Sequence, residues 1–208
     1  MDGRPGVSGD RERWNERHAA ALAAGRANGP PSAWLLEHAG VVAAQPRGRA
    51  LDVACGLGRN ALHLAAMGFR VLALDVSDVA VEHVARRARE RGLAVEARRV
   101  DLGREALPPG PFEVVVVASF LDRRLLGPLA RALAPGGLLL YDTFLADATA
   151  TCGPRDPAHV LRPGELSAAF AGLERLDLRE GAPAPGERAR ARLLARRRDG
   201  LPVCVPDT

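Results

Sequence analysis

A glycine-rich turn at residues 51–60, LDVACGLGRN, joins an apolar run to an amphipathic one and brings together residues that suit ligand binding. Gly56 and Gly58 lack Cβ atoms, so the chain can bend sharply there and a ligand can lie against the main chain near the positive end of a helix. The spacing Gly56-x-Gly58-x-x-Ala61 also satisfies the loose fingerprint of dinucleotide-binding proteins. The turn therefore predicts a nucleotide-like ligand without identifying it.

Two further carboxylates follow this turn in an order that suits the same ligand. Asp75 comes about 20 residues after the turn, where a carboxylate can accept hydrogen bonds from both hydroxyls of a ribose. Asp101 follows the third expected strand, 93–99, and could accept a hydrogen bond from an adenine amino group. Taken alone, Asp101 fits a helix cap or a loop better than it fits a ligand role. In order with Asp52, the glycines and Asp75, the ligand role is favoured.

The elements that must position these residues alternate between strand-like and helix-like segments. The expected strands are 50–54, 70–74, 93–99, 114–118 and 138–143, and the expected helices between them are 60–67, 78–91 and 123–133. Ser77 or Asp78 would cap the second of these helices. Strands that alternate with helices predict parallel pairing and right-handed crossovers. The run 114–118 is apolar throughout and predicts the middle of the sheet, covered on both faces.

The flanking segments are expected to complete a single domain over residues 13–208. Residues 1–12 are predicted to be a disordered lead-in, and 13–46 a helical cap with helices 13–22 and 33–44. Residues 47–145 form the cofactor-binding core, and 146–208 hold an acceptor-side loop, a short helix and two closing strands, 173–179 and 189–197. The last segment could be a helix on propensity alone. A strand is favoured because glycine and proline flank it and Arg190 and Arg192 alternate with alanines.

The basic net charge could indicate nucleic-acid binding, but other features of the sequence argue against it. The net charge is +4 and the pI about 9.7, but every one of the 29 basic residues is arginine. Such a bias is typical of a GC-rich genome, and aromatic residues for base stacking make up only 4%. We therefore expect no extended nucleic-acid-binding surface.

Neither a metal site nor a membrane segment is predicted. Cys55, Cys152 and Cys204 are far apart and odd in number, so they suggest neither a disulfide framework nor a zinc site. Cys55 is at the start of a helix but fits a packing role better than a reactive one. Apolar runs stay well below the roughly 20 residues that cross a bilayer, and the opening lacks the apolar stretch of a signal peptide. A cytoplasmic location is expected.

Taken together, these motifs resemble the class I S-adenosylmethionine-dependent methyltransferases. The resemblance covers residues 47–145 and rests on D-x-A-C-G-x-G-R-N, L-D-V-S, V-D-L, P-F-E-V-V-V-V and L-A-P-G-G-L-L-L-Y-D-T-F. On either side, W-N-E-R-H, F-L-D-R-R-L and C-G-P-R-D-P…L-R-P-G-E-L are similar to the group related to the tellurite-resistance methyltransferase. The resemblance implies an α/β, Rossmann-like, doubly wound sheet of about seven mostly parallel strands, the last antiparallel, with helices on both faces. It also implies S-adenosyl-L-methionine as the cofactor.

The resemblance further implies a set of cofactor contacts. Listed by the part of the cofactor, these are Asp52, Ala54 and Gly56 at the methionine end, Asp75 and Val76 at the ribose, Asp101 and Leu102 at the adenine, and Ser119 on the carboxylate or ribose side, with Gly58 and Ser77 in the same turns. Trp14 and Arg17 would lie on a helix that folds over the cofactor, and Asn60 would steady the turn. Ala54 departs from the family, which usually has glycine there.

Methyl transfer from a sulfonium needs alignment more than it needs a base. The enzyme accelerates an in-line displacement mainly by holding the nucleophile about 3–3.5 Å from the methyl carbon. By position, the acceptor-side candidates are Arg123, Tyr141, Arg155, His159 and Arg162. Arg155 and Arg162 are favoured for an anionic acceptor.

The resemblance favours a small-molecule acceptor, such as a chalcogen oxyanion, a thiol or a small acid, and leaves its identity and the oligomeric state open. One alternative is a nicotinamide-dependent reductase, although a chain without lysine cannot hold a Tyr-x-x-x-Lys pair. The other is a protein that binds S-adenosylmethionine without transferring its methyl group.

Overall fold

A single seven-stranded sheet organises the molecule, with the strand order β3-β2-β1-β4-β5-β7-β6. The computed structural model describes residues 7–146, 154, 156–182 and 187–199. The strands are β1 (Arg49–Val53), β2 (Arg70–Asp75), β3 (Val95–Arg99), β4 (Phe112–Ala118), β5 (Leu133–Phe144), β6 (Glu174–Gly181) and β7 (Arg190–Arg196). The helices are α1 (Val7–Ala23), α2 (Ala33–Glu37), α3 (Ala39–Ala43), α4 (Arg59–Ala66), α5 (Asp78–Glu90), α6 (Leu126–Ala132) and α7 (Glu165–Ala169). Short 3-10 turns are η1 (Arg26–Asn28), η2 (Arg123–Leu125) and η3 (Pro157–His159).

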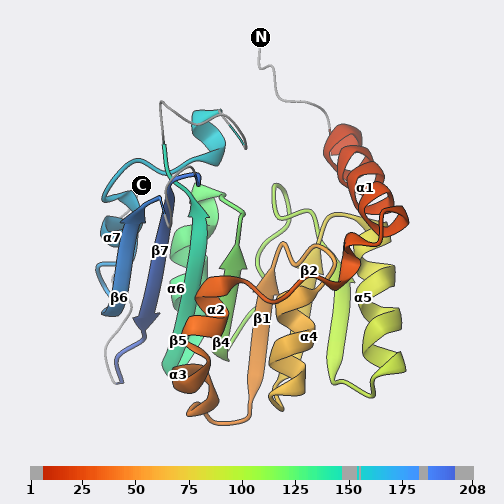
Figure 1. Ribbon diagram of the computed structural model, residues 1–208. Helices are drawn as coiled ribbons and strands as arrows, with labels where there is room; N and C mark the ends of the chain where they lie inside the picture. Colours follow the sequence, from red (N-terminus) through yellow and green to blue (C-terminus); the bar gives the residue numbers. More distant parts are fainter. Residues whose placement is uncertain (1–6, 147–153, 155, 183–186, 200–208) are drawn as a thin grey trace.

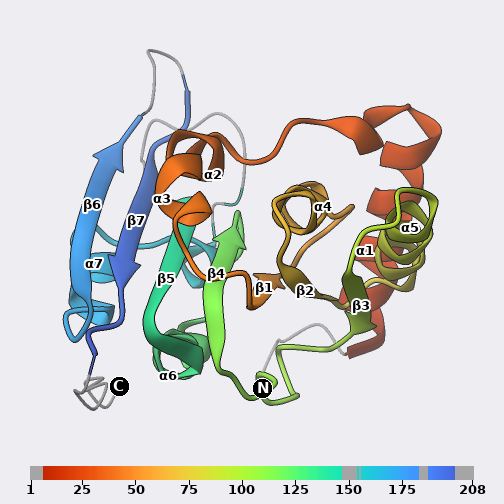
Figure 2. The same cartoon turned by 90° about the horizontal axis from the view of Figure 1, so that it is seen from below.

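Helices cover both faces of this sheet, as the sequence predicted. Helices α2, α3 and α4 lie on one face and α6 on the other, while α1 and α5 lie side by side near β3 (Figures 1 and 2). Strands β1 to β5 pair in parallel, and β7 runs antiparallel to both β5 and β6. The carboxyl ends of the parallel strands therefore meet at one edge, where ligands collect in sheets of this kind.

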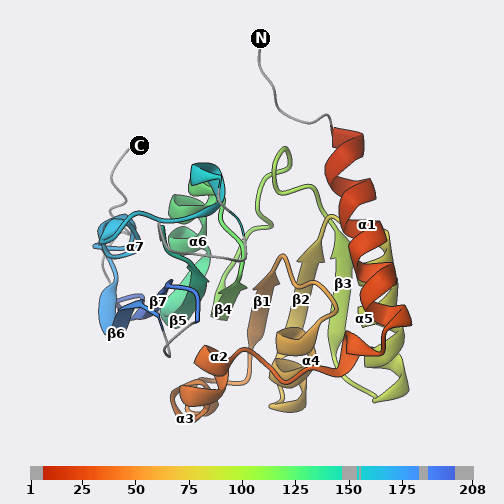
Figure 3. The same cartoon turned by 45° about the horizontal axis from the view of Figure 1, so that its top comes forward.

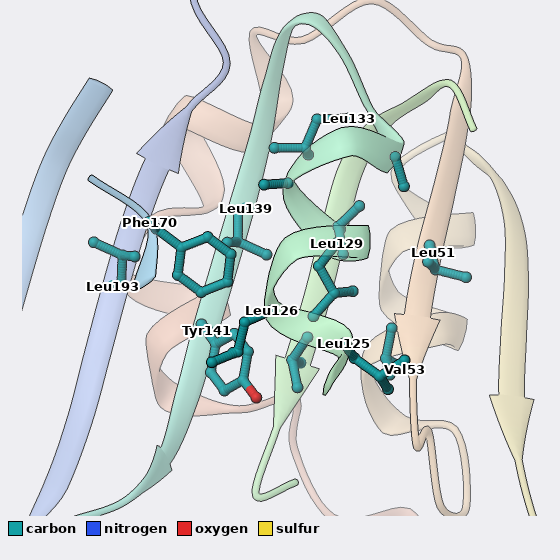
Figure 4. Close-up of a cluster of buried hydrophobic side chains, with 14 of the residues drawn as sticks. Leu51, Val53, Leu125, Leu126, Leu129, Leu133, Leu139, Tyr141, Phe170 and Leu193 are labelled. Carbon is teal, nitrogen blue, oxygen red and sulfur yellow. The ribbon is translucent and has the colours of Figure 1, made fainter. Parts of the chain in front are cut away.

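Alternation along each strand sends side chains to two separate apolar clusters. Leu51 and Val53 pack with α6 and α7 in one cluster, which is shown in Figure 4, and Ala50 packs with α2 and α4 in the other. Strand β4 contributes to both clusters and lies in the middle of the sheet. The prediction from its unbroken apolar run is confirmed, and so is the choice of strand over helix for 189–197.

The crossover from β3 to β4 is made without a helix. Residues 100–111 form turns and irregular chain, and Leu102 and Leu107 pack into the same apolar cluster as α6. Every other parallel crossover contains a helix. On the α6 side of β1 and β2, this loop supplies part of the cover that a helix would otherwise give.

The structure differs most from the expected elements at three places. Helix α1 begins at Val7, inside the segment expected to be disordered, where Asp10 pairs with Arg13 at 2.8 Å. The expected helix 33–44 is divided at His38, because the Trp34 carbonyl oxygen accepts from the His38 ring Nδ1, at 3.0 Å, and not from the His38 backbone N–H as it would in a continuous helix. Strand β5 begins at Leu133, which pairs with Phe112 of β4.

Candidate functional site

The glycine-rich turn connects β1 to α4, and Asp52 of β1 links the two elements. The Asp52 carboxylate is buried and accepts a hydrogen bond from the backbone N–H of Ala61 at 2.9 Å. It thereby satisfies one of the free N–H groups in the first turn of α4. Gly58 has a φ of 80°, and a Cβ atom there would lie 2.5 Å from Val84 Cγ2. Only glycine lets the turn and α5 pack this closely.

Asp75, at the end of β2, ties the glycine turn to the start of α5. Its Oδ2 accepts from the backbone N–H of Gly56 at 2.8 Å, and its Oδ1 accepts from that of Ser77 at 2.9 Å. The Ser77 hydroxyl accepts from Ala80 N and is the N-cap of α5, as predicted. Asp75 therefore shapes both turns, and each of its oxygens keeps a further lone pair for a ligand hydroxyl.

Charge at this end of the sheet is dominated by the two acids. Burial, reinforced by the charge of Asp75, raises the pKa of Asp52 to about 7. Burial and both carboxylates also raise the pKa of the Cys55 thiol, which therefore stays protonated and unreactive. A cationic ligand would favour the ionised form of Asp52, so the residues present fit a cofactor that carries an ammonium and a sulfonium group.

Helix α1 is fastened across the start of α5. The Asn15 carbonyl oxygen accepts from the Ser77 hydroxyl at 2.7 Å, and Arg11 pairs with Asp78 at 2.5 Å. These contacts place α1 beside the turns that follow β1 and β2 (Figure 3).

One face of α1 lies over the glycine turn. Trp14 stacks on His18 with the ring centroids 5.5 Å apart, and the Arg17 guanidinium lies 5.0 Å from the Trp14 ring. A Cβ atom on Gly56 would lie 3.4 Å from His18 Cε1. Burial lowers the pKa of His18 although Asp75 opposes the shift. His18 was missed in the sequence, where its position four residues after Trp14 was the available signal.

The other residues predicted to contact the cofactor lie in the turns that follow β1, β2 and β3. Asp101 follows β3, and its carboxylate accepts from Gly103 N at 3.0 Å, while Leu102 is buried in the core. Val76 is half-buried between Asp75 and Ser77. Ala54 has a φ of 52°, a left-handed conformation that explains why the family usually has glycine there.

Asn60 has a different contact from the one expected. Its side-chain oxygen accepts from the backbone N–H of Ser32 at 2.8 Å, and Asn60 is buried. Ser32 is the N-cap of α2, so Asn60 joins α4 to α2. The contact lies across two helices that are far apart in sequence, which local spacing could not reveal.

Among the described acceptor-side candidates, Arg123 and Arg162 meet at Glu165, where Arg162 Nε lies 3.5 Å from Oε2. Arg123 donates to both Glu165 oxygens, at 2.5 and 3.1 Å, and to the Val160 carbonyl, so it holds α7 and the preceding loop. Tyr141 is buried, its hydroxyl donates to the Phe120 carbonyl at 3.2 Å, and burial raises its pKa (Figure 4). His159 and Arg162 are exposed, and Arg155 lies outside the described residues.

Sequence reasoning missed a charged cluster at the carboxyl ends of β4 and β5. The Ser119 hydroxyl accepts from Arg190 Nη2 at 2.9 Å, and Arg190 Nε lies 2.5 Å from Asp142 Oδ1. Arg192 Nε lies 3.5 Å from the same oxygen. The available signal was the alternation of Arg190 and Arg192 with apolar residues at the start of β7.

Comparison with known proteins connects this geometry to a family. Residues 50–137 match the family described as "Methyltransferase domain". The ubiquinone biosynthesis O-methyltransferase of Caulobacter sp. (strain K31) is 30% identical over 145 residues, which are 60% of this chain and 58% of that protein. The chain thus spans little more than half the length of this curated relative.

Solved structures share the fold at lower identity. TehB from Haemophilus influenzae has a TM-score of 0.67 at 19% identity, with 79% of this chain and 61% of that chain covered. The [4+2]-cyclase SpnF has a TM-score of 0.61 at 23% identity, with 78% and 80% covered. None of the described helices is both long and apolar enough to cross a membrane. The matched residues contain the glycine turn, Asp75 and Asp101, so the part of the chain that forms the candidate site is the part that is similar to the methyltransferase domain family, and the fold is one that solved methyltransferase structures share.

Proposed function

We propose that the protein transfers a methyl group from S-adenosylmethionine to a small-molecule nucleophile by in-line displacement. The observation that carries the proposal is the acid pair around Gly56. Asp75 accepts from Gly56 N and retains acceptor capacity for a ribose, and Asp52 is poised with a pKa of about 7 where a cation would favour its ionisation. When bound, the cofactor supplies an electrophilic methyl group.

The residues of this chain would then bind and orient. Asp75 would hold the ribose hydroxyls, Asp52 would act on the ammonium end, and Asp101 would accept from the adenine amino group. The face of α1 that carries Trp14 and His18 would cover the site and exclude water. Tyr141, with a raised pKa, would not serve as a base, which fits a reaction accelerated by alignment.

A small acceptor suits the charge and composition of the chain better than a nucleic acid does. Aromatic residues for base stacking are scarce, and many exposed arginines pair with neighbouring acids. The curated relatives are named for O-methylation in ubiquinone biosynthesis, so oxygen nucleophiles are the first class to test. Fold alone does not decide the reaction, since a [4+2]-cyclase shares it.

Calorimetry and turnover test the proposal in two steps. S-adenosylhomocysteine should bind more tightly than NAD or NADP, and tighter binding of either dinucleotide would contradict the methyltransferase reading. A panel of phenols, carboxylic acids, thiols and chalcogen oxyanions, assayed for release of S-adenosylhomocysteine, should contain at least one acceptor. Binding without turnover across the panel would favour a non-catalytic binding protein.

Asp75→Asn gives the matched test of the site. The amide retains one acceptor oxygen for the turns but loses the charge and one acceptor position toward the ribose. Since charge-assisted hydrogen bonds contribute about 1.5–3 kcal/mol each, affinity for S-adenosylhomocysteine should fall about 10- to 100-fold. Thermal melts without ligand control for damage to the turns, and unchanged affinity would show that Asp75 is not a ligand of the ribose.

A further inference from the structure

Strands β5 and β7 bring three charged side chains to one face of the sheet. Asp142 pairs directly with Arg192 in the antiparallel register, and Phe144 pairs with Arg190. Leu140 and Leu194 lie two residues from Asp142 and Arg192 and pack into the apolar cluster beneath α2 and α4. Because side chains on one face recur every second residue, Asp142, Arg190 and Arg192 point to that same face.

The charges of this cluster do not balance. Arg190 and Arg192 both lie against the single carboxylate of Asp142, at 2.5 and 3.5 Å, and no other acid pairs with either arginine in the described residues. The side chains of both arginines are 16% exposed and that of Asp142 is 10% exposed. One positive charge is therefore in excess in a largely buried place, where an unpaired charge is costly.

Arg192 has N–H donors that are not used in hydrogen bonds within the described residues. Arg190 donates through Nε to Asp142 Oδ1 and through Nη2 to Ser119 Oγ and the Asp142 carbonyl. Arg192 Nε is buried and has no hydrogen-bond partner among the described residues. A guanidinium presents donors in a planar fork that matches the two oxygens of a carboxylate.

The cluster adjoins the proposed cofactor site. Arg190 reaches Ser119, which follows β4, and β4 is the direct neighbour of β1, with Val117 paired to Val53. Strands in a sheet are about 4.8 Å apart, so the carboxyl ends of β1 and β5 are about 10 Å apart. Ser119 has a φ of 59°, a strained conformation of the kind found at functional sites.

We propose that Arg192, assisted by Arg190, binds a carboxylate of the methyl acceptor and so holds its nucleophile beside Ser119. This inference rests on the proposed methyl transfer and narrows the acceptor to small carboxylic acids. The cofactor has a carboxylate of its own, on its methionine part, and the test must separate these two sources.

The probe is 4-fluorobenzoate, observed by ¹⁹F NMR with protein saturated by S-adenosylhomocysteine. Wild-type protein should bind it saturably, and acetate should displace it. Arg192→Gln should weaken probe binding at least tenfold, since it removes the charge-assisted hydrogen bonds to the probe carboxylate. Arg196→Gln is the matched control, because Arg196 lies on the same face of β7 at its other end and pairs with Glu174.

Stability separates a ligand role from a structural one. Arg192→Gln leaves Asp142 paired with Arg190 and removes the excess charge, so its melting temperature should equal or exceed that of wild type. A lower melting temperature with unchanged probe binding would overturn the proposal and make Arg192 a structural partner of Asp142.

Two further results would also overturn it. The first is equal probe affinity in Arg192→Gln and Arg196→Gln. The second is loss of S-adenosylhomocysteine affinity in Arg192→Gln with no loss of 5′-methylthioadenosine affinity, which would assign the arginine to the cofactor's own carboxylate. Calorimetry with S-adenosylhomocysteine on wild type reports the proposed function separately, so a failure there is distinguishable from a failure of the carboxylate site.

Discussion

The carboxyl group of Asp52 makes the ligand-free protein sensitive to pH. Its pKa is raised to about 7 by burial and by Asp75, against about 3.9 in an unfolded chain. Because the pKa is higher in the folded state, protonated Asp52 contributes to the free energy of unfolding. This contribution is complete below about pH 4 and is lost as the pH rises through about 7. Asp52→Asn should remove this part of the pH profile of the melting temperature.

Cofactor affinity should change in the opposite sense over the same range. Ionised Asp52 attracts the ammonium group of S-adenosylhomocysteine, so binding should tighten between about pH 6 and 8. Calorimetry across this range checks it, and Asp52→Asn should flatten the curve. His18→Asn is the control, because its lowered pKa leaves His18 neutral in the upper part of the range. A pH dependence that persists in Asp52→Asn would assign the effect to another group.

Ala54 is strained in a way that one substitution should relieve. A left-handed conformation costs an L-residue about 1–2 kcal/mol. Glycine avoids this cost but destabilises the folded state by about 0.5–1 kcal/mol, because it increases the entropy of the unfolded chain. Ala54→Gly should therefore raise the free energy of unfolding by about 0.5–1 kcal/mol. Urea denaturation measures this, and Ala85→Gly, in the middle of α5, should destabilise by a similar amount. Destabilisation by Ala54→Gly would mean that the strain is not present in solution.

At the scale of elements, α1 depends on Asn15 for its position. Asn15 accepts from the Ser77 hydroxyl and from Val79 N, so Asn15→Ala should free α1 from the start of α5. We expect faster hydrogen exchange over residues 7–23 and weaker S-adenosylhomocysteine binding, with a loss of only about 1 kcal/mol in global stability. Glu16→Ala, an exposed change on the same helix, is the control. Unchanged exchange would show that α1 is held by other contacts.

The same helix illustrates what sequence patterns can reveal about elements. Apolar alternation and glycine punctuation predicted every strand of the sheet, because these signals are local. The start of α1 was missed since its contact with α5 joins Arg11 to Asp78, far along the chain. The division at His38 was missed for the same reason, because its ring also contacts Asp177 of β6 at 3.2 Å.

At the scale of the whole molecule, the high pI should not produce strong nucleic-acid binding. Arginines at the surface form local pairs with acids, among them Arg86 and the half-buried Arg87 with Glu90, Arg98 with Glu96, and Arg124 with Asp122. Fluorescence anisotropy with a 20-nucleotide RNA should therefore show binding no tighter than about 100 μM at 150 mM salt. Micromolar affinity with a steep salt dependence would contradict this prediction and would indicate that the protein binds nucleic acid.

The site shows where prediction from sequence stops. Asp52, the glycine turn and Asp75 follow one another along β1 and β2, so spacing was enough to bring them together. Arg190 and Ser119 are 71 positions apart and meet only because β7 inserts beside β5. Which strand would neighbour which could not be read from periodicity, and the charged cluster was missed on that account.

The position of β7 also determines the order in which the strands can pair during translation. It is the last strand in the described chain, yet it lies between β5 and β6, so β6 has no partner in the sheet until residues 190–196 have been synthesised. During translation, the half of the sheet that holds the glycine turn can pair strand by strand as it leaves the ribosome, whereas the half that holds Arg190 and Arg192 cannot. A nascent chain stalled before Arg190 would expose the edges of β5 and β6 together, which are surfaces that chaperones and other nascent chains can pair with.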